Sequence, residues 1–163
     1  MTNDRAPALR ELRPTRAADL DLCLAAEADP EVAPFIAPWR RAEHLAALTD
    51  PDQRHLLVVS GGRPVGFVLL GGLSRPDGVI EFRRLVVTAR GRGLGRAAVA
   101  LVVEEAFGRF GADRLWLDVK PDNHRARHVY ESAGFTVDSE GDLIVMSRVS
   151  GGGGPIGADP AAR

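Results

Sequence analysis

Cysteine is almost absent from this chain, since Cys23 is the only one among 163 residues. A single cysteine excludes an internal disulfide and a cysteine-rich zinc site. Its place on the apolar stripe of an expected helix indicates a small core residue and not a nucleophile. Long apolar runs are also lacking: none approaches the length of a membrane span, and the first residues contain no stretch resembling a signal peptide. A cytoplasmic protein without a membrane partner is therefore expected.

Excess charge of one sign is missing as well. The chain has 21 Lys and Arg against 22 Asp and Glu, which gives a formal net charge of −1 at pH 7. Nucleic-acid-binding domains are usually strongly basic, so no nucleic-acid partner is expected. A chain of 163 residues is long enough for one globular domain with a sizeable core.

The order of apolar patterns predicts an α/β (α+β) domain. Expected strands cover residues 8–12, 54–59, 63–73, 78–87, 113–119, 135–139 and 142–148, and expected helices cover residues 16–28, 40–48, 96–110 and 122–133. Three successive strands with tight links imply antiparallel neighbours, whereas the strand–helix–strand unit over 78–119 implies parallel ones. We therefore expect a mixed, mostly antiparallel sheet of about six or seven strands, flanked by helices, with one central βαβ unit.

The last residues differ in composition from the rest. Residues 150–163 have almost no apolar mass and contain four glycines in a row. Such a stretch predicts a disordered Gly/Pro-rich tail after a domain of residues 1–149.

A glycine-rich turn, ARGRGLG at residues 89–95, lies between an expected strand and an expected helix. Free backbone N–H groups and the helix dipole make such a turn an anion site, most often for phosphate. A P-loop is excluded because Arg96-Ala97 follows Gly95 in place of Lys-Ser/Thr. A dinucleotide-binding turn fits G-x-G-x-x-A from Gly93, with Asp118 as the ribose-binding acid. The chain left over is too short for a doubly wound sheet, so this interpretation stands as an alternative.

Two motifs together favour another family. Residues 90–95 have the pattern R-x-x-G-x-G, and residues 123–135 have the pattern N-x-x-A-x-x-x-Y-E-x-x-G-F. With these motifs the sequence resembles the GNAT superfamily of acyl-CoA-dependent N-acetyltransferases, over roughly Leu9 to Arg148. The resemblance implies acetyl transfer from acetyl-CoA to a primary amine of a small molecule or peptide, by direct attack in a ternary complex and without a metal. It also allows a homodimer. A non-catalytic acyl-CoA-binding domain is a further alternative.

The resemblance also implies the residues that bind the donor. The glycine turn would hold the pyrophosphate through Arg90, Gly91, Arg92, Gly93, Leu94, Gly95 and Arg96. The backbone of Leu85, Val86 and Val87 would pair with the pantetheine arm, and one N–H there would polarise the thioester carbonyl. Asn123 matches a coenzyme-contacting asparagine, although its place at a helix start also favours N-capping.

Two residues match the catalytic positions of the family. Glu81 matches a glutamate base that deprotonates the amine, whose pKa is about 10.4 for a lysine-like amine. An ion pair with Arg83 or Arg84 is the alternative role for Glu81, and Glu27 and Glu31 are further candidate bases. Tyr130 matches the tyrosine that protonates the leaving thiolate, and its alternative is a packed aromatic with a solvated hydroxyl.

His124 and His128 have the i, i+4 spacing of a two-histidine metal site. The segment HRARH lacks the glutamate of H-E-x-x-H, and no third ligand is evident. We therefore expect a solvated helix face and no metal.

Overall fold

The structure is a computed structural model that describes residues 9–88 and 93–151. Its centre is a seven-stranded sheet of order β1-β2-β3-β4-β5-β7-β6. The strands are β1 (Arg10–Pro14), β2 (Arg54–Ser60), β3 (Arg63–Gly71), β4 (Val79–Val87), β5 (Arg114–Val119), β6 (Thr136–Glu140) and β7 (Ile144–Val149). The helices are η1 (Ala17–Asp19), α1 (Leu20–Glu27), α2 (Arg41–Thr49), α3 (Leu94–Val103), η2 (Glu104–Arg109) and α4 (His124–Ser132).

The strand directions confirm the predicted sheet. β4 and β5 are parallel neighbours, and all other neighbouring pairs are antiparallel. The helix between them begins at Leu94, slightly before the predicted start, and continues into the π-helical turn η2. The central βαβ unit is thus present. The sites predicted at Arg90, Gly91 and Arg92, and the tail beyond Gly151, lie outside the described residues.

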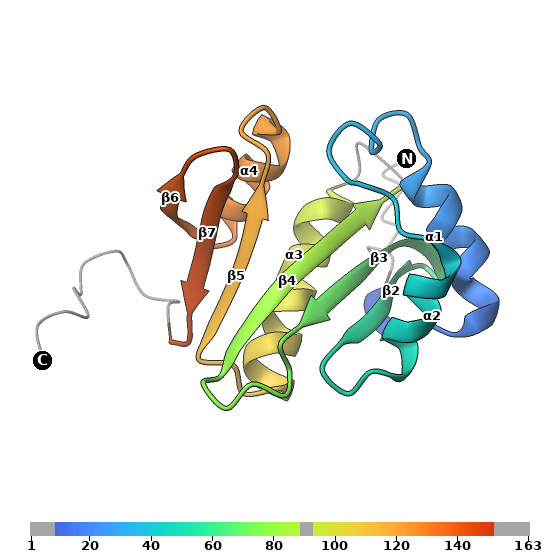
Figure 1. Ribbon diagram of the computed structural model, residues 1–163, viewed down its shortest axis with the longest axis horizontal. Coiled ribbons are helices and arrows are strands. Elements are labelled where there is room, and N and C mark those ends of the chain that lie inside the picture. The colour runs from blue at the N-terminus through green and yellow to red at the C-terminus, as the bar shows by residue number, and fades with distance from the viewer. Residues whose placement is uncertain (1–8, 89–92, 152–163) are drawn as a thin grey trace, which may run out of the picture.

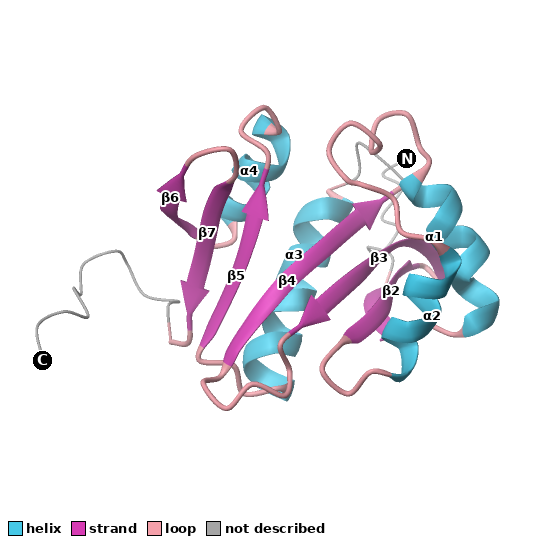
Figure 2. Cartoon of the chain, viewed as in Figure 1, coloured by secondary structure: helices cyan, strands magenta, loops and turns pink. Residues whose placement is uncertain are grey.

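Helices cover both faces of the sheet: α3 and α4 lie on one face, and α1 and α2 lie on the other (Figures 1 and 2). Each face has its own hydrophobic cluster, because apolar side chains alternate between the two faces along the strands. Cys23 is fully buried in the cluster under α1 and α2, which confirms that it is a core residue. Within residues 9–88 and 93–151, no helix is long and apolar enough to cross a membrane.

Two irregularities of β4 create space for a site. β4 pairs with β5 only over Val79–Glu81, and beyond this point the two strands diverge (Figure 1). The register with β3 shifts from Leu69 opposite Arg84 to Leu70 opposite Phe82, which makes Arg83 the extra residue of a β-bulge. Because of the bulge, Leu85 packs on the same cluster as Phe82, whereas Val86 packs on the opposite cluster.

Candidate active site

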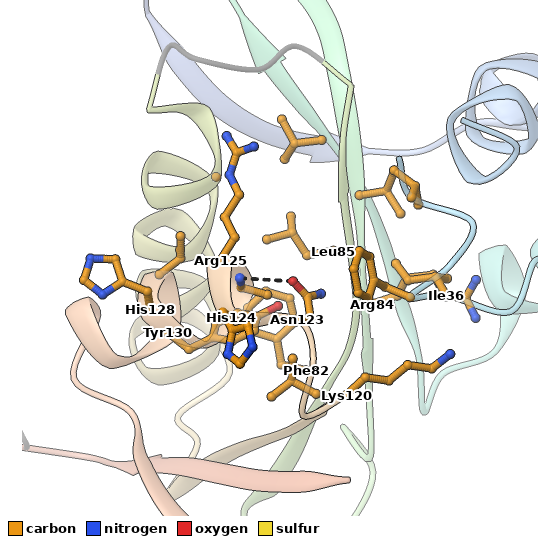
Figure 3. Close-up of a pocket in the computed structure, with 18 of the residues that line it drawn as sticks. Ile36, Phe82, Arg84, Leu85, Lys120, Asn123, His124, Arg125, His128 and Tyr130 are labelled. Carbon is orange, nitrogen blue, oxygen red and sulfur yellow. Dashed lines mark hydrogen bonds between the residues drawn. The ribbon is translucent and has the colours of Figure 1, made fainter. Parts of the chain in front are cut away.

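A cavity of about 760 Å³ lies where β4 and β5 diverge. The volume is within the range of small-molecule and cofactor sites. In Figure 3, His124, Arg125, His128 and Tyr130 lie on one side of the cavity, and Arg84 and Ile36 lie on the other. The cavity therefore brings together α3, α4, the second half of β4 and the segment between α1 and α2.

One end of the cavity is formed by the start of α3. Gly93 is the N-cap residue of this helix, and its φ of 66° lies in the left-handed region that favours glycine. Gly93, Leu94, Gly95 and Arg96 all line the cavity, and no acidic residue occurs in the first turn of α3. Arg96 Nη2 donates to His128 Nε2 at 3.3 Å. The helix dipole and the guanidinium both favour an anion at this end.

The free edge of β4 forms the floor. Leu85, Val86 and Val87 line the cavity, and their strand pairs with β3 on the side away from it. On the cavity side, β4 has no partner strand beyond Glu81 in the part of the chain that the structure describes. An extended ligand could therefore add to this edge as another strand does.

α4 contributes the two residues predicted from the second motif. Tyr130 lines the cavity, and its ring makes edge-to-face contacts with Phe82 and Phe135 at centroid distances of 5.9 and 5.8 Å. Burial, with the nearby charge of Asp118, raises the pKa of Tyr130 to about 12, so the phenol is protonated at neutral pH. Asn123 Oδ1 caps α4 by accepting from Ala126 N–H at 3.2 Å. Asn123 also lines the cavity, so capping and ligand contact are compatible.

Two carboxylates lie near the divergence of the strands, and they differ in their surroundings. Glu81 is not among the residues that line the cavity, and its Oε2 accepts from Arg83 Nε and Nη2 at 3.1 and 2.9 Å. Of the two arginines considered for this ion pair, the partner is thus Arg83. Asp118, near the end of β5, does line the cavity. Burial, followed by the negative charge of Glu81, raises the pKa of Asp118 above its ordinary value.

The opposite wall comes from the segment between α1 and α2. Glu31, Val32, Phe35, Ile36 and Ala37 line this side. Glu27 does not, because its side chain is completely buried and contacts His44 and Arg84. Of the alternative bases considered above, only Glu31 therefore lines the cavity.

Metal binding has no support in the described residues. His124 and His128 line the cavity, but residues 9–88 and 93–151 contain no group of three potential metal ligands.

Some cavity residues were not predicted for this site. Arg125 and Lys120 were not singled out, and Asp118 was considered only as a ribose-binding acid. A signal for Asp118 exists in the sequence, since a charged residue near the end of a buried strand is unusual.

Comparison with known proteins gives consistent results. The sequence profile described as "Acetyltransferase (GNAT) family" matches residues 18–135. An uncharacterized N-acetyltransferase of Mycobacterium tuberculosis is 31% identical over 118 residues, which are 71% of this chain and 74% of the relative. The spermidine N(1)-acetyltransferase of Escherichia coli K12 is 28% identical over 92 residues, which are 56% of this chain and 50% of the relative.

Solved structures share the fold at low sequence identity. Spermidine N-acetyltransferase from Vibrio cholerae, in complex with CoA and spermine, matches with a TM-score of 0.76 at 19% identity, covering 86% of this chain and 95% of that one. Aminoglycoside acetyltransferase AAC(6')-Ib, in complex with coenzyme A and kanamycin, matches with a TM-score of 0.76 at 19% identity, covering 88% and 96%. The profile match and the 31% identical relative show that this chain belongs to the GNAT family and is an acetyl-CoA-dependent N-acetyltransferase.

Proposed function

We propose that this enzyme transfers the acetyl group directly to a primary amine while acetyl-CoA and the amine are bound together. The observation that carries this proposal is that one continuous cavity is lined both by the start of α3 and by the segment between α1 and α2. Donor and acceptor would then bind next to each other in one site, at the open edge of β4.

A covalent acetyl-enzyme is disfavoured by the residues available. Cys23 is completely buried and does not line the cavity, and burial raises the pKa of its thiol to about 12. Among the described residues, no serine, threonine or cysteine lines the cavity. An intermediate on the enzyme would require an accessible, activated nucleophile.

The donor would bind with its pyrophosphate at Gly93–Arg96 and its pantetheine arm along Leu85–Val87. Both segments line the cavity. Asn123 would add a polar contact from α4. The free backbone N–H and C=O groups at the edge of β4 suit the amide groups of pantetheine.

The chemistry needs a base and an acid. The amine nitrogen attacks the thioester carbonyl and loses a proton to a carboxylate, and the C–S bond then breaks with the electron pair on sulfur. The protonated phenol of Tyr130 would supply the proton that the thiolate takes up. For the base, Asp118 fits better than Glu81, because Asp118 lines the cavity and Glu81 is paired with Arg83.

The acceptor class follows from the charges near the acceptor wall. Glu31, Asp118 and Asp122 line the cavity and would attract a cationic amine; the lining also contains the cations Arg83, Arg84, Arg96, Lys120 and Arg125. Spermine and kanamycin, which are bound in the two structural neighbours, are amines of this type. Small polycationic amines are therefore proposed first, with peptide amines next.

The test is a screen of amines with acetyl-CoA, monitored by thiol release and by the mass of the product. Polyamines and aminoglycosides should release CoA in proportion to N-acetylated product. CoA release that is unchanged by every amine class would contradict acetyl transfer to an amine at this site.

A further inference from the structure

The acceptor wall is formed by residues 29–39, here called the strap, which is neither strand nor α-helix. Its internal hydrogen bonds are short-range: Val32 and Ala33 N–H donate to Asp29 O, and Phe35 N–H donates to Val32 O, all at 2.9 Å. Local turns of this kind do not determine where a segment lies relative to a sheet. The position of the strap therefore depends on its contacts with the strands.

Two cations from the diverging strands bind carbonyl groups of the strap. Arg84 Nη1, on β4, donates to Ala37 O at 2.8 Å. Lys120 Nζ, next to the end of β5, donates to Pro34 O at 2.9 Å. The strap thus bridges the two strands where they have separated, and Arg84 and Lys120 both extend to the strap side of the cavity in Figure 3.

Arg84 is itself held by the buried carboxylate of Glu27. The side chains of Glu27 and Arg84 are 0% and 10% exposed, and Arg84 Nη1 donates to Glu27 Oε2. The same carboxylate oxygen accepts the backbone N–H of Trp39, at the end of the strap, at 3.0 Å. The guanidinium also lies over the Trp39 ring, 5.2 Å from its centroid. One ion pair therefore joins α1, β4 and the strap.

A series of buried, hydrogen-bonded side chains extends from Glu27 away from Arg84. His44 Nε2 contacts Glu27 Oε1, His44 Nδ1 lies 3.0 Å from His55 Nε2, and His55 Nδ1 lies 2.8 Å from Thr15 Oγ1. One assignment of protons satisfies the whole chain with neutral imidazoles: Thr15 donates to His55, His55 to His44, and His44 to Glu27. Burial lowers the pKa of His55 to about 4, which agrees with a neutral ring.

The opposite charges of Glu27 and Arg84 balance each other inside the protein. Burial by itself would raise the pKa of Glu27, but hydrogen bonds from His44 and Trp39 and the charge of Arg84 hold it below its ordinary value. Removing either partner would leave a buried charge unpaired, which costs far more than a surface ion pair. Arg84 therefore adds no net charge to the strap side of the cavity, because Glu27 neutralises it.

We propose that Arg84, braced by buried Glu27, is a positioning residue that holds the strap at the acceptor side of the cavity and so determines the KM for the amine. The assignment of the strap to the acceptor rests on the proposed function. Arg84 takes no part in the proton transfers and does not contact the phosphate end of the cavity. Its loss should therefore affect the acceptor and leave the coenzyme unaffected.

The test compares Arg84→Met with Arg114→Met. Arg114 is a control for the loss of an arginine ion pair elsewhere in the sheet: it lies on β5, pairs with Asp138 at 2.6 Å, is 43% exposed and does not line the cavity. Arg84→Met should raise the acceptor KM by about tenfold or more, with kcat and the Kd of acetyl-CoA changed by less than about twofold. Hydrogen exchange at the Trp39 amide should become faster. Arg114→Met should leave all four quantities at the parental values.

Two further variants distinguish the loss of the strap contact from a general loss of stability. Arg84→Lys keeps the charge and should restore much of the acceptor KM. Arg84→Met combined with Glu27→Gln removes both charges, so that no lone charge is buried, and it should still raise the acceptor KM. An unchanged KM in Arg84→Met and in the double variant would overturn the positioning role while acetyl transfer by the parent stands.

A parent enzyme that acetylates no amine would contradict the proposed function but would still leave the strap contact testable. In that case the exchange of the Trp39 amide decides. Faster exchange in Arg84→Met than in Arg114→Met supports the role of Arg84 in holding the strap, and equal exchange overturns it.

Discussion

Tyr130 is the only tyrosine of the chain, so its hydroxyl can be followed without interference. Its ring packs between Phe82 and Phe135, and the residue lines the cavity. Packing uses the ring and the proposed proton transfer uses the hydroxyl, so one substitution separates the two roles.

Tyr130→Phe should lower kcat by about 10²–10⁴, the usual contribution of a positioned general acid. The Tm and the acetyl-CoA affinity should change little, because the ring is retained. Steady-state kinetics with an identified amine, beside thermal melts, provide the measurement. Parental turnover in this variant, where chemistry is rate-limiting, would mean that Tyr130 only packs.

The carboxylates of Asp118 and Glu81 lead to a prediction about how kcat/KM depends on pH. A base works when ionised, so kcat/KM should fall as the pH drops through the pKa of Asp118, which burial and Glu81 raise above the ordinary value of 3.8. Asp118→Asn should lower the plateau of kcat/KM by about 10²–10⁴. Glu81→Gln removes a negative charge, so it should shift the acidic limb to lower pH and leave the plateau nearly unchanged.

The pH profiles of both variants, measured beside the parent, distinguish the two carboxylates. A parental profile for Asp118→Asn together with a lost plateau for Glu81→Gln would identify Glu81 as the base. The other ionisable residues that line the cavity, Tyr130, Lys120, Asp122 and His124 among them, are unchanged in both variants.

At the scale of elements, the two ends of the continuous helix formed by α3 and η2 offer a matched pair of glycines. Gly93 and Gly111 have positive φ values of 66° and 61°, and a Cβ at either would meet no atom within 4 Å. Valine at either position should therefore cost about 1–2 kcal/mol of folding free energy through backbone strain. Only Gly93 lines the cavity.

Gly93→Val should weaken acetyl-CoA binding by about tenfold or more, which corresponds to at least about 1.4 kcal/mol. Gly111→Val should lower the Tm about as much as Gly93→Val does, but it should leave the acetyl-CoA affinity unchanged. Titration calorimetry and melting curves of both variants test this. Equal affinities would remove the start of α3 from the coenzyme site.

The buried histidines of α2 and β2, His44 and His55, lead to a prediction of how the stability of the fold depends on pH. The pKa of His55 is about 4 in the folded protein, against 6.5 for the free side chain. Between these values the unfolded chain binds the proton that the folded protein excludes, so stability falls as the pH drops from about 6.5 to about 4. The expected loss is up to about 3 kcal/mol.

His55→Gln should weaken this dependence, because glutamine does not titrate. Urea unfolding of the parent and of His55→Gln across that pH range gives the measurement. Parallel curves for the two proteins would show that other groups cause the acid sensitivity.

At the scale of the whole molecule, coenzyme binding should stabilise the fold. Acetyl-CoA at a hundred times its Kd should add about 2.7 kcal/mol of stability and raise the Tm by about 5–10 °C for a domain of this size. NAD(H) at the same concentration is the control. A Tm that rises with NAD(H) and not with acetyl-CoA would favour a dinucleotide site in this cavity.

The fold was predictable because its signals are local. Apolar periodicity and turn residues indicated each helix and strand, and the strand–helix–strand order implied the parallel pair that β4 and β5 form. Tyr130 and Asn123 were identified differently, through the resemblance of one short motif to the GNAT superfamily, and both line the cavity. Asn123 proved to be the N-cap of α4, a role that its position in the motif had also suggested.

The rest depended on contacts between distant parts of the chain. Glu27 and Arg84 are 57 residues apart, and neither has a local pattern that indicates the other. The bulge at Arg83 turns Arg84 toward α1, and it leaves Glu81 paired with Arg83. The sequence by itself determined the order of elements and the glycine at the start of α3, because these depend on neighbours in the chain. Only the tertiary structure decided which carboxylate lines the cavity and which cation holds the strap, because those choices depend on strand register and burial.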